Sequence, residues 1–262
     1  MSKLHFSYEM IIKYAEPVER CNFTIKCIPQ NTCRQRIEDI VIKILPPIDY
    51  SWGKDGLGNT QIYGPNDVPH DTFVYRIDGK AVTQLCEYEE LVDEGNAMIF
   101  RHPHGLNVAG GKIKEYHKSL DIPNNLTDLA KATYIMKKLY SDFNYMQGVT
   151  NVETTAEEAF ALGKGVCQDY SHIFISLLHL EKIPARYVTG MIIGEGKSHA
   201  WTEIIYDGKW YGLDATNGHP VNGGYVKIGV GRDAKDCMIN RGIMHGGGPQ
   251  RQEINVIVNE IF

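Results

Sequence analysis

Alternating hydrophobic and polar positions in the first hundred residues predict short β-strands. The period of two runs over residues 6–12 and 21–27 and, in part, over 40–44. Prolines at positions 29, 46–47, 65 and 69 separate these runs. Short strands divided by such residues are typical of an antiparallel β-sandwich, which we predict for residues 1–105.

Hydrophobic residues recur at helical spacing in the next part of the chain. Thr127 is a candidate N-cap for a helix, and residues 155–158 have the sequence of a capping box. A third helix is expected to begin at Cys167, and strands are expected over 185–193, 199–206, 209–214 and 253–261. The fold class is therefore α+β. We predict a connector at 106–126 and a catalytic-type α+β domain at 127–262.

Two Asp-Gly pairs predict β-hairpin turns. Asp78-Gly79 follows a strand-like run at 72–77, and Asp207-Gly208 separates two further runs at 204–206 and 209–211. The second turn fixes a register, because side chains in paired strands alternate strictly between the two faces. The register pairs residue 206 with 209, 204 with 211, 202 with 213 and 201 with 214.

The same register places His199 opposite Thr216 and puts Asp214 on its diagonal. Diagonal neighbours on one sheet face lie about 7–8 Å apart at Cα, within reach of an imidazole and a carboxylate. The sequence therefore predicts a His199–Asp214 pair with Trp201 beside it. Taken singly, His199 is typical of an ordinary sheet histidine, and Asp214 of a turn-forming residue after a strand.

Cys167 is the candidate nucleophile. It follows Gly163 and Gly165 and begins a predicted helix, where the positive end of the helix dipole favours a thiolate. A buried structural cysteine is the alternative reading of this residue alone. Together with a histidine oriented by an aspartate, however, it completes a nucleophile, base and orienter. His199 would carry the proton, Asp214 would hold the imidazole, and the Cys167 N–H would face the developing oxyanion.

Composition and charge limit the kinds of binding partner and the cellular location that we expect. The 262 residues are enough for two domains, and the net charge of −5 without a Lys/Arg block predicts neither a nucleic-acid nor a membrane partner. The N-terminus lacks an apolar signal region, and no apolar run of about 18 residues occurs. Six cysteines are too few for a disulfide scaffold. We therefore expect a cytoplasmic protein with reduced thiols, and the oligomeric state stays open.

Four sequence blocks resemble the transglutaminase-like superfamily. They are Gly165-Val-Cys-Gln-Asp-Tyr-Ser-His172, Ile183-Pro-Ala-Arg-Tyr-Val-Thr-Gly190, His199-Ala-Trp-Thr-Glu203 and Trp210-Tyr-Gly-Leu-Asp-Ala-Thr216. The similarity is strongest to the bacterial cysteine-protease-like branch, whose C-terminal signature resembles residues 229–242. It covers about residues 127–262, and the first hundred residues resemble, more weakly, the β-sandwich that precedes the catalytic domain in this branch.

The resemblance implies a papain-like core with Cys167 as nucleophile, His199 as base and Asp214 as third member. It also places Tyr145 near the site, while Gln168 and Trp201 are expected in the substrate or oxyanion vicinity. Asp169 could compete with Asp214 for His199, but the hairpin register favours Asp214. We further expect Arg232 and Asp233 to form a structural ion pair beneath the site.

The predicted function is cysteine-dependent acyl transfer on amide bonds of a peptide or protein substrate through a thioester. Hydrolysis by a protease, amidase or deamidase is favoured by the resemblance. Protein crosslinking and a non-catalytic binding or scaffold module are the alternatives. Thiolate chemistry needs no cofactor. The chain has no C-x-x-C pair and no acidic loop with calcium-ligand spacing, so no metal is expected.

Overall fold

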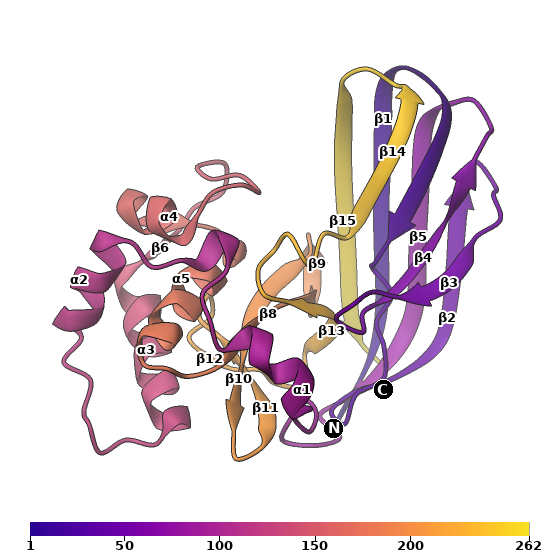
Figure 1. Ribbon diagram of the computed structural model, residues 1–262. Helices are drawn as coiled ribbons and strands as arrows, with labels where there is room; N and C mark the ends of the chain where they lie inside the picture. The colour runs from indigo at the N-terminus through magenta and orange to yellow at the C-terminus, as the bar shows by residue number, and fades with distance from the viewer. Residues whose placement is uncertain (262) are drawn as a thin grey trace.

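The computed structural model describes residues 1–261 and confirms the α+β class. Figure 1 shows a large twisted sheet on one side, a helical layer on the other and a second sheet between them. All strand pairs in the two larger sheets are antiparallel, and only the short pair β6–β7 is parallel.

The large sheet has eight strands joined by hydrogen bonds into one surface. Its central strand β1 is 24 residues long, and its register shifts between Lys13 and Val18. The first half of β1 pairs with β5 and β15, and the second half pairs with β4 and β14. The strands are β1 (Ser2–Ile25), β2 (Arg36–Leu45), β3 (Ser51–Lys54), β4 (Thr60–Asn66), β5 (His70–Thr83), β9 (Gly194–Gly196), β14 (Asn240–Gly246) and β15 (Gln250–Glu260).

The C-terminal strands correct the predicted domain limits. β14 and β15 fall in the range assigned to the catalytic domain, but both pair with β1 at the other end of the chain. β15 aligns Phe6 with Val258 and Met10 with Ile254. The period of two at 253–261 correctly predicts a strand, but it contains no information about which sheet edge that strand joins. The division at 127–262 is therefore wrong for this segment.

The predicted turn at Asp78-Gly79 is also wrong. β5 runs unbroken through both residues, and Ser7 and Phe6 of β1 pair with them. A Cβ atom at position 79 would lie 2.6 Å from the Phe6 ring, which is closer than any real contact. Gly79 is therefore explained by the close approach of an aromatic ring and not by a turn.

The second sheet has the order β12-β11-β10-β8-β13. Helix α5 packs against its strands β8 and β10, and helices α2, α3 and α4 pack against α5. The strands are β8 (Ala185–Ile192), β10 (His199–Tyr206), β11 (Lys209–Asp214), β12 (His219–Pro220) and β13 (Tyr225–Gly231), and the separate parallel pair is β6 (Asn144–Tyr145) with β7 (Lys164–Gly165). The α-helices are α1 (Glu94–Ala97), α2 (Gly111–Ser119), α3 (Asp128–Asp142), α4 (Ala156–Leu162) and α5 (Cys167–Leu180), and the 3-10 turns are η1 (Met98–Phe100) and η2 (Gly105–Asn107).

The predicted connector at 106–126 contains a helix that belongs to the core. Helix α2 buries Ile113 completely, in the same hydrophobic cluster as α3 and α5. Leu106 and Leu120 are also buried. The prediction failed because Gly110-Gly111 looks like a linker, whereas here Gly110 is the N-cap residue of α2.

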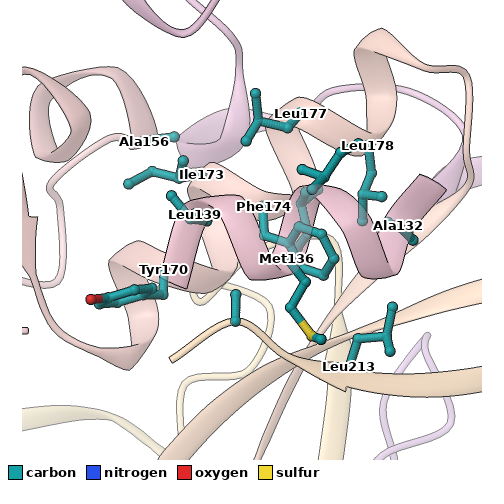
Figure 2. Close-up of a cluster of buried hydrophobic side chains, with 14 of the residues drawn as sticks. Ala132, Met136, Leu139, Ala156, Tyr170, Ile173, Phe174, Leu177, Leu178 and Leu213 are labelled. Atoms are coloured by element: carbon teal, nitrogen blue, oxygen red, sulfur yellow. The ribbon is translucent and has the colours of Figure 1, made fainter. Parts of the chain in front are cut away.

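Two large hydrophobic cores stabilise the two sheets. Figure 2 shows the first, where Phe174 and Leu178 of α5 meet Met136 of α3 and Leu213 of β11. The second core is enclosed by the large sheet and also contains Met191 of β8 and Val226 and Ile228 of β13. Because side chains of the second sheet complete this core, the two sheets are packed against each other.

None of the helices in the described part of the chain combines the length and the apolar composition needed to cross a membrane.

Candidate active site

Cys167 is the first residue of α5, as predicted. Helix α4 ends at Gly163 in the left-handed conformation (φ 67°), and the chain then turns through β7 into α5. At the first helical position the backbone N–H has no acceptor within the helix. The N–H group and the dipole of this 14-residue helix therefore face the space in front of the Cys167 thiol.

Asp169 holds this turn together and does not compete for His199. Its Oδ2 accepts hydrogen bonds from the Val166 N–H and the Thr150 hydroxyl, both at 2.7 Å. Burial raises the pKa of Asp169 against the effect of these two donors. A Cβ at Gly165 would lie 2.4 Å from the Asp169 carboxylate, so glycine is needed for the turn to close.

The Asp207-Gly208 turn sets the predicted register. Asp207 and Gly208 have φ values of 50° and 66°, as a two-residue hairpin requires. The observed pairs include Tyr206 with Lys209, Ile204 with Tyr211 and Thr202 with Leu213. Beyond Thr202 the strands separate: His199 pairs with Gly190 on β8, and Asp214 pairs with His219 on β12.

His199 and Asp214 nevertheless meet as the register predicts. His199 donates from Nε2 to Asp214 Oδ2 at 2.8 Å, and both residues are buried. Cys167 and His199 line the same cleft, and Cys167 lies close enough to His199 to raise its pKa. The structure thus brings together the three residues that the sequence selected, from α5, β10 and β11.

Asp214 accepts hydrogen bonds at both oxygens. Oδ2 accepts from His199 Nε2 and also from the Tyr225 hydroxyl and Asn217 Nδ2, both at 2.7 Å. Oδ1 accepts from the N–H groups of Thr216 (2.8 Å) and Asn217 (3.3 Å). Oδ1 of Asp214 therefore stabilises the turn after β11, while Oδ2 orients His199. Asp214 is both a turn-forming residue and the partner of the histidine, the two roles that the sequence suggested.

These contacts determine the charge states of the pair. Burial acts to raise the pKa of Asp214, but its hydrogen bonds, above all that from His199, lower it below its ordinary value. Burial acts to lower the pKa of His199, but hydrogen bonds and charges of Asp214 and Cys167 raise it to about 10. The imidazolium form of His199 is consequently favoured at neutral pH, next to the Asp214 carboxylate.

Trp201 packs beside His199 and does not line the cleft among the described residues. Its ring lies 6.3 Å from the His199 ring at an angle of 29°, and it is 1% exposed. The ring fits because position 190 is glycine: a Cβ there would lie 2.4 Å from both the Trp201 ring and the Val226 carbonyl oxygen. Trp201 therefore packs against His199 and helps to hold its ring in place.

We expect Gly190→Ala to lower the free energy of unfolding by about 1–3 kcal/mol, because the added methyl group must displace the Trp201 ring or the β13 backbone. Urea denaturation measures the change. Gly196→Ala is the matched control, since a Cβ at position 196 meets no atom within 4 Å. Equal stability of the two variants would contradict the assigned packing.

Cys167 and His199 open into a cleft of about 800 Å³. Tyr145 and Gln168 line it, as predicted for the vicinity of the site. Tyr145 is half exposed and is held near the nucleophile because β6 pairs it with Gly165. Gln168 Nε2 approaches the carbonyl oxygens of the loop at 151–152 at 3.4–3.5 Å.

The large sheet forms a second wall of this cleft. Residues 194–196, which immediately precede the histidine strand, pair as β9 with residues 256–258 of β15. Ile254 and Val256 of β15 line the cleft directly. Neither this wall nor the roles of Tyr225 and Asn217 as partners of Asp214 were predicted from the sequence. The turn composition of Asp214-Ala-Thr-Asn217-Gly218 is the signal that could have indicated Asn217.

The expected ion pair of Arg232 with Asp233 does not form. Arg232 binds Asp236, with Nε–Oδ2 at 2.7 Å. Asp233 is buried and instead accepts hydrogen bonds from the N–H groups of Leu106 and Lys235. Arg232 and Asp233 are adjacent in sequence, but their side chains bind different partners.

Two family models match the chain. Residues 119–215 match the transglutaminase-like superfamily, and residues 4–82 match the bacterial transglutaminase-like N-terminal region. The chain thus combines a segment similar to the core of the transglutaminase-like superfamily with a segment similar to this bacterial N-terminal region. These similarities and the site geometry together support an enzyme of the cysteine type.

Relatives and a solved structure extend this similarity over the whole chain. An uncharacterized protein of Mycobacterium tuberculosis is 29% identical over 253 residues, covering 83% of this chain and 79% of that protein. An uncharacterized protein of Mycobacterium leprae is 33% identical over 131 residues, covering 46% and 47% respectively. A crystal structure from Cytophaga hutchinsonii, described as a candidate cysteine protease, has a TM-score of 0.81 at 23% identity, covering 100% of this chain and 91% of that chain. This last likeness shows a shared fold.

Proposed function

We propose that this protein is a cysteine hydrolase that cleaves amide bonds in a peptide or protein substrate. The observation that carries the proposal is that Cys167, at the start of a helix, shares one cleft with His199, whose ring is hydrogen-bonded to Asp214. A thiol, an imidazole and a buried carboxylate in this order are the parts needed for covalent acyl transfer.

In the first half-reaction the Cys167 sulfur attacks the amide carbon, and the carbonyl oxygen gains negative charge. The N–H of Cys167 is placed to donate to this oxyanion. His199 then gives its proton to the departing nitrogen as the C–N bond breaks, leaving a thioester on Cys167 and a free amine or ammonia. Asp214 keeps His199 oriented throughout and stabilises its charged form.

In the second half-reaction His199 removes a proton from water, and the oxygen attacks the thioester carbon. The C–S bond breaks, the carboxylic acid leaves and the Cys167–His199 pair is restored. Exposed residues such as Glu195 and Lys197 border the cleft, which supports access of water to the thioester. Attack by an amine in place of water would give crosslinking.

Intact-mass spectrometry with peptide and glutamine-amide substrates tests this function. We expect a covalent acyl adduct on Cys167 at short times and, in H₂¹⁸O, one ¹⁸O atom in the released acid. Cys167→Ala should give neither. Turnover without ¹⁸O but with incorporation of an added amine would establish crosslinking instead. No adduct and no turnover across the substrate panel would favour a non-catalytic module.

Thiol reactivity gives an independent prediction. Iodoacetamide should modify Cys167 at least about tenfold faster than Cys33 at pH 6.5, because a thiolate is the attacking species and His199 provides a cationic partner. Cys33 is the control, since it is exposed whereas Cys167 is only partly exposed. Peptide mapping of the label over time measures both rates. Faster labelling of Cys33 would show that exposure alone decides reactivity.

A further inference from the structure

A second cavity of about 340 Å³ lies beside the catalytic cleft; we call it the side pocket. Its size is at the lower end of the range of about 300–1,000 Å³ that is usual for ligand sites. It lies where the large sheet meets the second sheet, with walls from β1, β8, β15 and the segment 234–240.

The side pocket continues the catalytic cleft. Five residues line both cavities: Gln168, Tyr187, Thr189, Ser198 and Ile254. Gln168 follows the nucleophile directly in sequence, and Ser198 directly precedes the histidine. A substrate whose amide carbon meets the Cys167 sulfur can therefore extend a neighbouring side chain into the side pocket.

Apolar groups form most of the inner wall of the side pocket. Met10 of β1 and Tyr187 of β8 are buried there, and Met238 lies half exposed at its edge. Further apolar lining comes from Tyr8, Val152, Ala234, Cys237, Ile239 and Ile254.

The charged groups of the pocket do not favour a charged ligand. Glu153 and Lys235 are the only charged side chains among the described lining residues, and they pair with each other at 2.5 Å. Burial of a substrate charge in this pocket would therefore lack a compensating partner. An apolar side chain of the substrate would instead displace water from the apolar surface of the pocket.

We propose that the side pocket binds a large apolar side chain, such as Leu, Met or Phe, next to the residue whose amide is attacked. The N-terminal region then acts as a specificity element, because Tyr8 and Met10 of β1 form part of the pocket wall. This inference rests on the proposed amide hydrolysis, and it adds the class of substrate that the hydrolase selects.

The test uses internally quenched peptides in which each position on both sides of the cleaved bond is varied in turn. We expect one position at which Leu, Met or Phe raises kcat/KM by about 10- to 100-fold over Ala, the effect of burying one large apolar side chain. At the same position Asp and Lys should fall below Ala. A flat profile at every position would overturn the inference.

Met238→Lys tests the pocket itself. Its side chain is 42% exposed, so the change should leave the fold intact while placing a charge at the edge of the pocket. We expect the preference for Leu over Ala to fall by about tenfold at the selected position, and acidic side chains to gain. Ile243→Lys is the matched control: this residue of β14 is 81% exposed and lines neither cavity. An unchanged preference in Met238→Lys would contradict the assignment.

The outcomes separate the two proposals. Failure of all peptides to be cleaved or to acylate Cys167 would contradict the proposed hydrolysis. Cleavage without apolar preference would leave hydrolysis standing and remove the side-pocket assignment. The iodoacetamide labelling rate of Cys167 in each variant reports whether the nucleophile is intact.

Discussion

His199→Ala should lower kcat/KM for amide substrates by about 10³-fold or more. The substitution removes the proton donor for the leaving group and the cationic partner of Cys167 at once. Loss of a general acid–base group alone costs about 10²–10⁴-fold. Steady-state kinetics on the best peptide, with iodoacetamide labelling of Cys167, measures both roles.

His245→Ala is the control for this prediction. His245 is an exposed histidine on β14 whose Nδ1 contacts Glu19, and it lies outside the cleft lining. Its replacement should change neither rate. Comparable activity in His199→Ala and the wild type would exclude His199 as the acid–base group.

Stability should fall as pH rises from 6.5 to 8.5, and the His199–Asp214 pair should cause a slope of about 1.4 kcal/mol per pH unit. The pKa of His199 is raised to about 10 in the folded protein, against about 6.5 for an unfolded histidine. The pair's contribution is therefore complete below pH 6.5 and is lost progressively toward pH 10. Urea denaturation at several pH values measures it.

Asp214→Asn isolates the pair from other titrating groups. The amide has no charge to hold the imidazolium, so the pKa of His199 should fall and the slope above pH 6.5 should flatten. Other buried groups, such as Glu89, whose pKa burial raises to about 7, are common to both proteins, so the difference between the two curves reports the pair. Parallel curves for both proteins would show that His199 is not charged in the folded state.

Local signals predicted the geometry of the candidate site well. Asp207-Gly208 requires positive φ at both residues, and this turn fixes the strand register that brings His199 to Asp214. The helix start at Cys167 follows from the preceding glycines and the spacing of its apolar residues. These features could be read from the sequence because each depends on residues at most 15 positions apart.

Contacts between residues far apart in the sequence could not be predicted in the same way. Asp78-Gly79 has the composition of a turn, but Phe6 packs on Gly79 and keeps β5 straight. Nothing near Tyr225 in the sequence indicates that its hydroxyl binds Asp214, since a strand pattern does not specify a hydrogen-bond partner across the sheet.

The sequence by itself determined the hairpin around Asp207-Gly208, the helix that begins at Cys167 and the His199–Asp214 pair. Only the tertiary structure decided that β15 returns to β1, and that β9 attaches the segment before His199 to this sheet. The physical reason is that alternation of side chains marks a strand but leaves its partner open. The partner is chosen by burial over the whole chain, and that choice makes the large sheet, through β9 and β15, a wall of the cleft that contains Cys167 and His199.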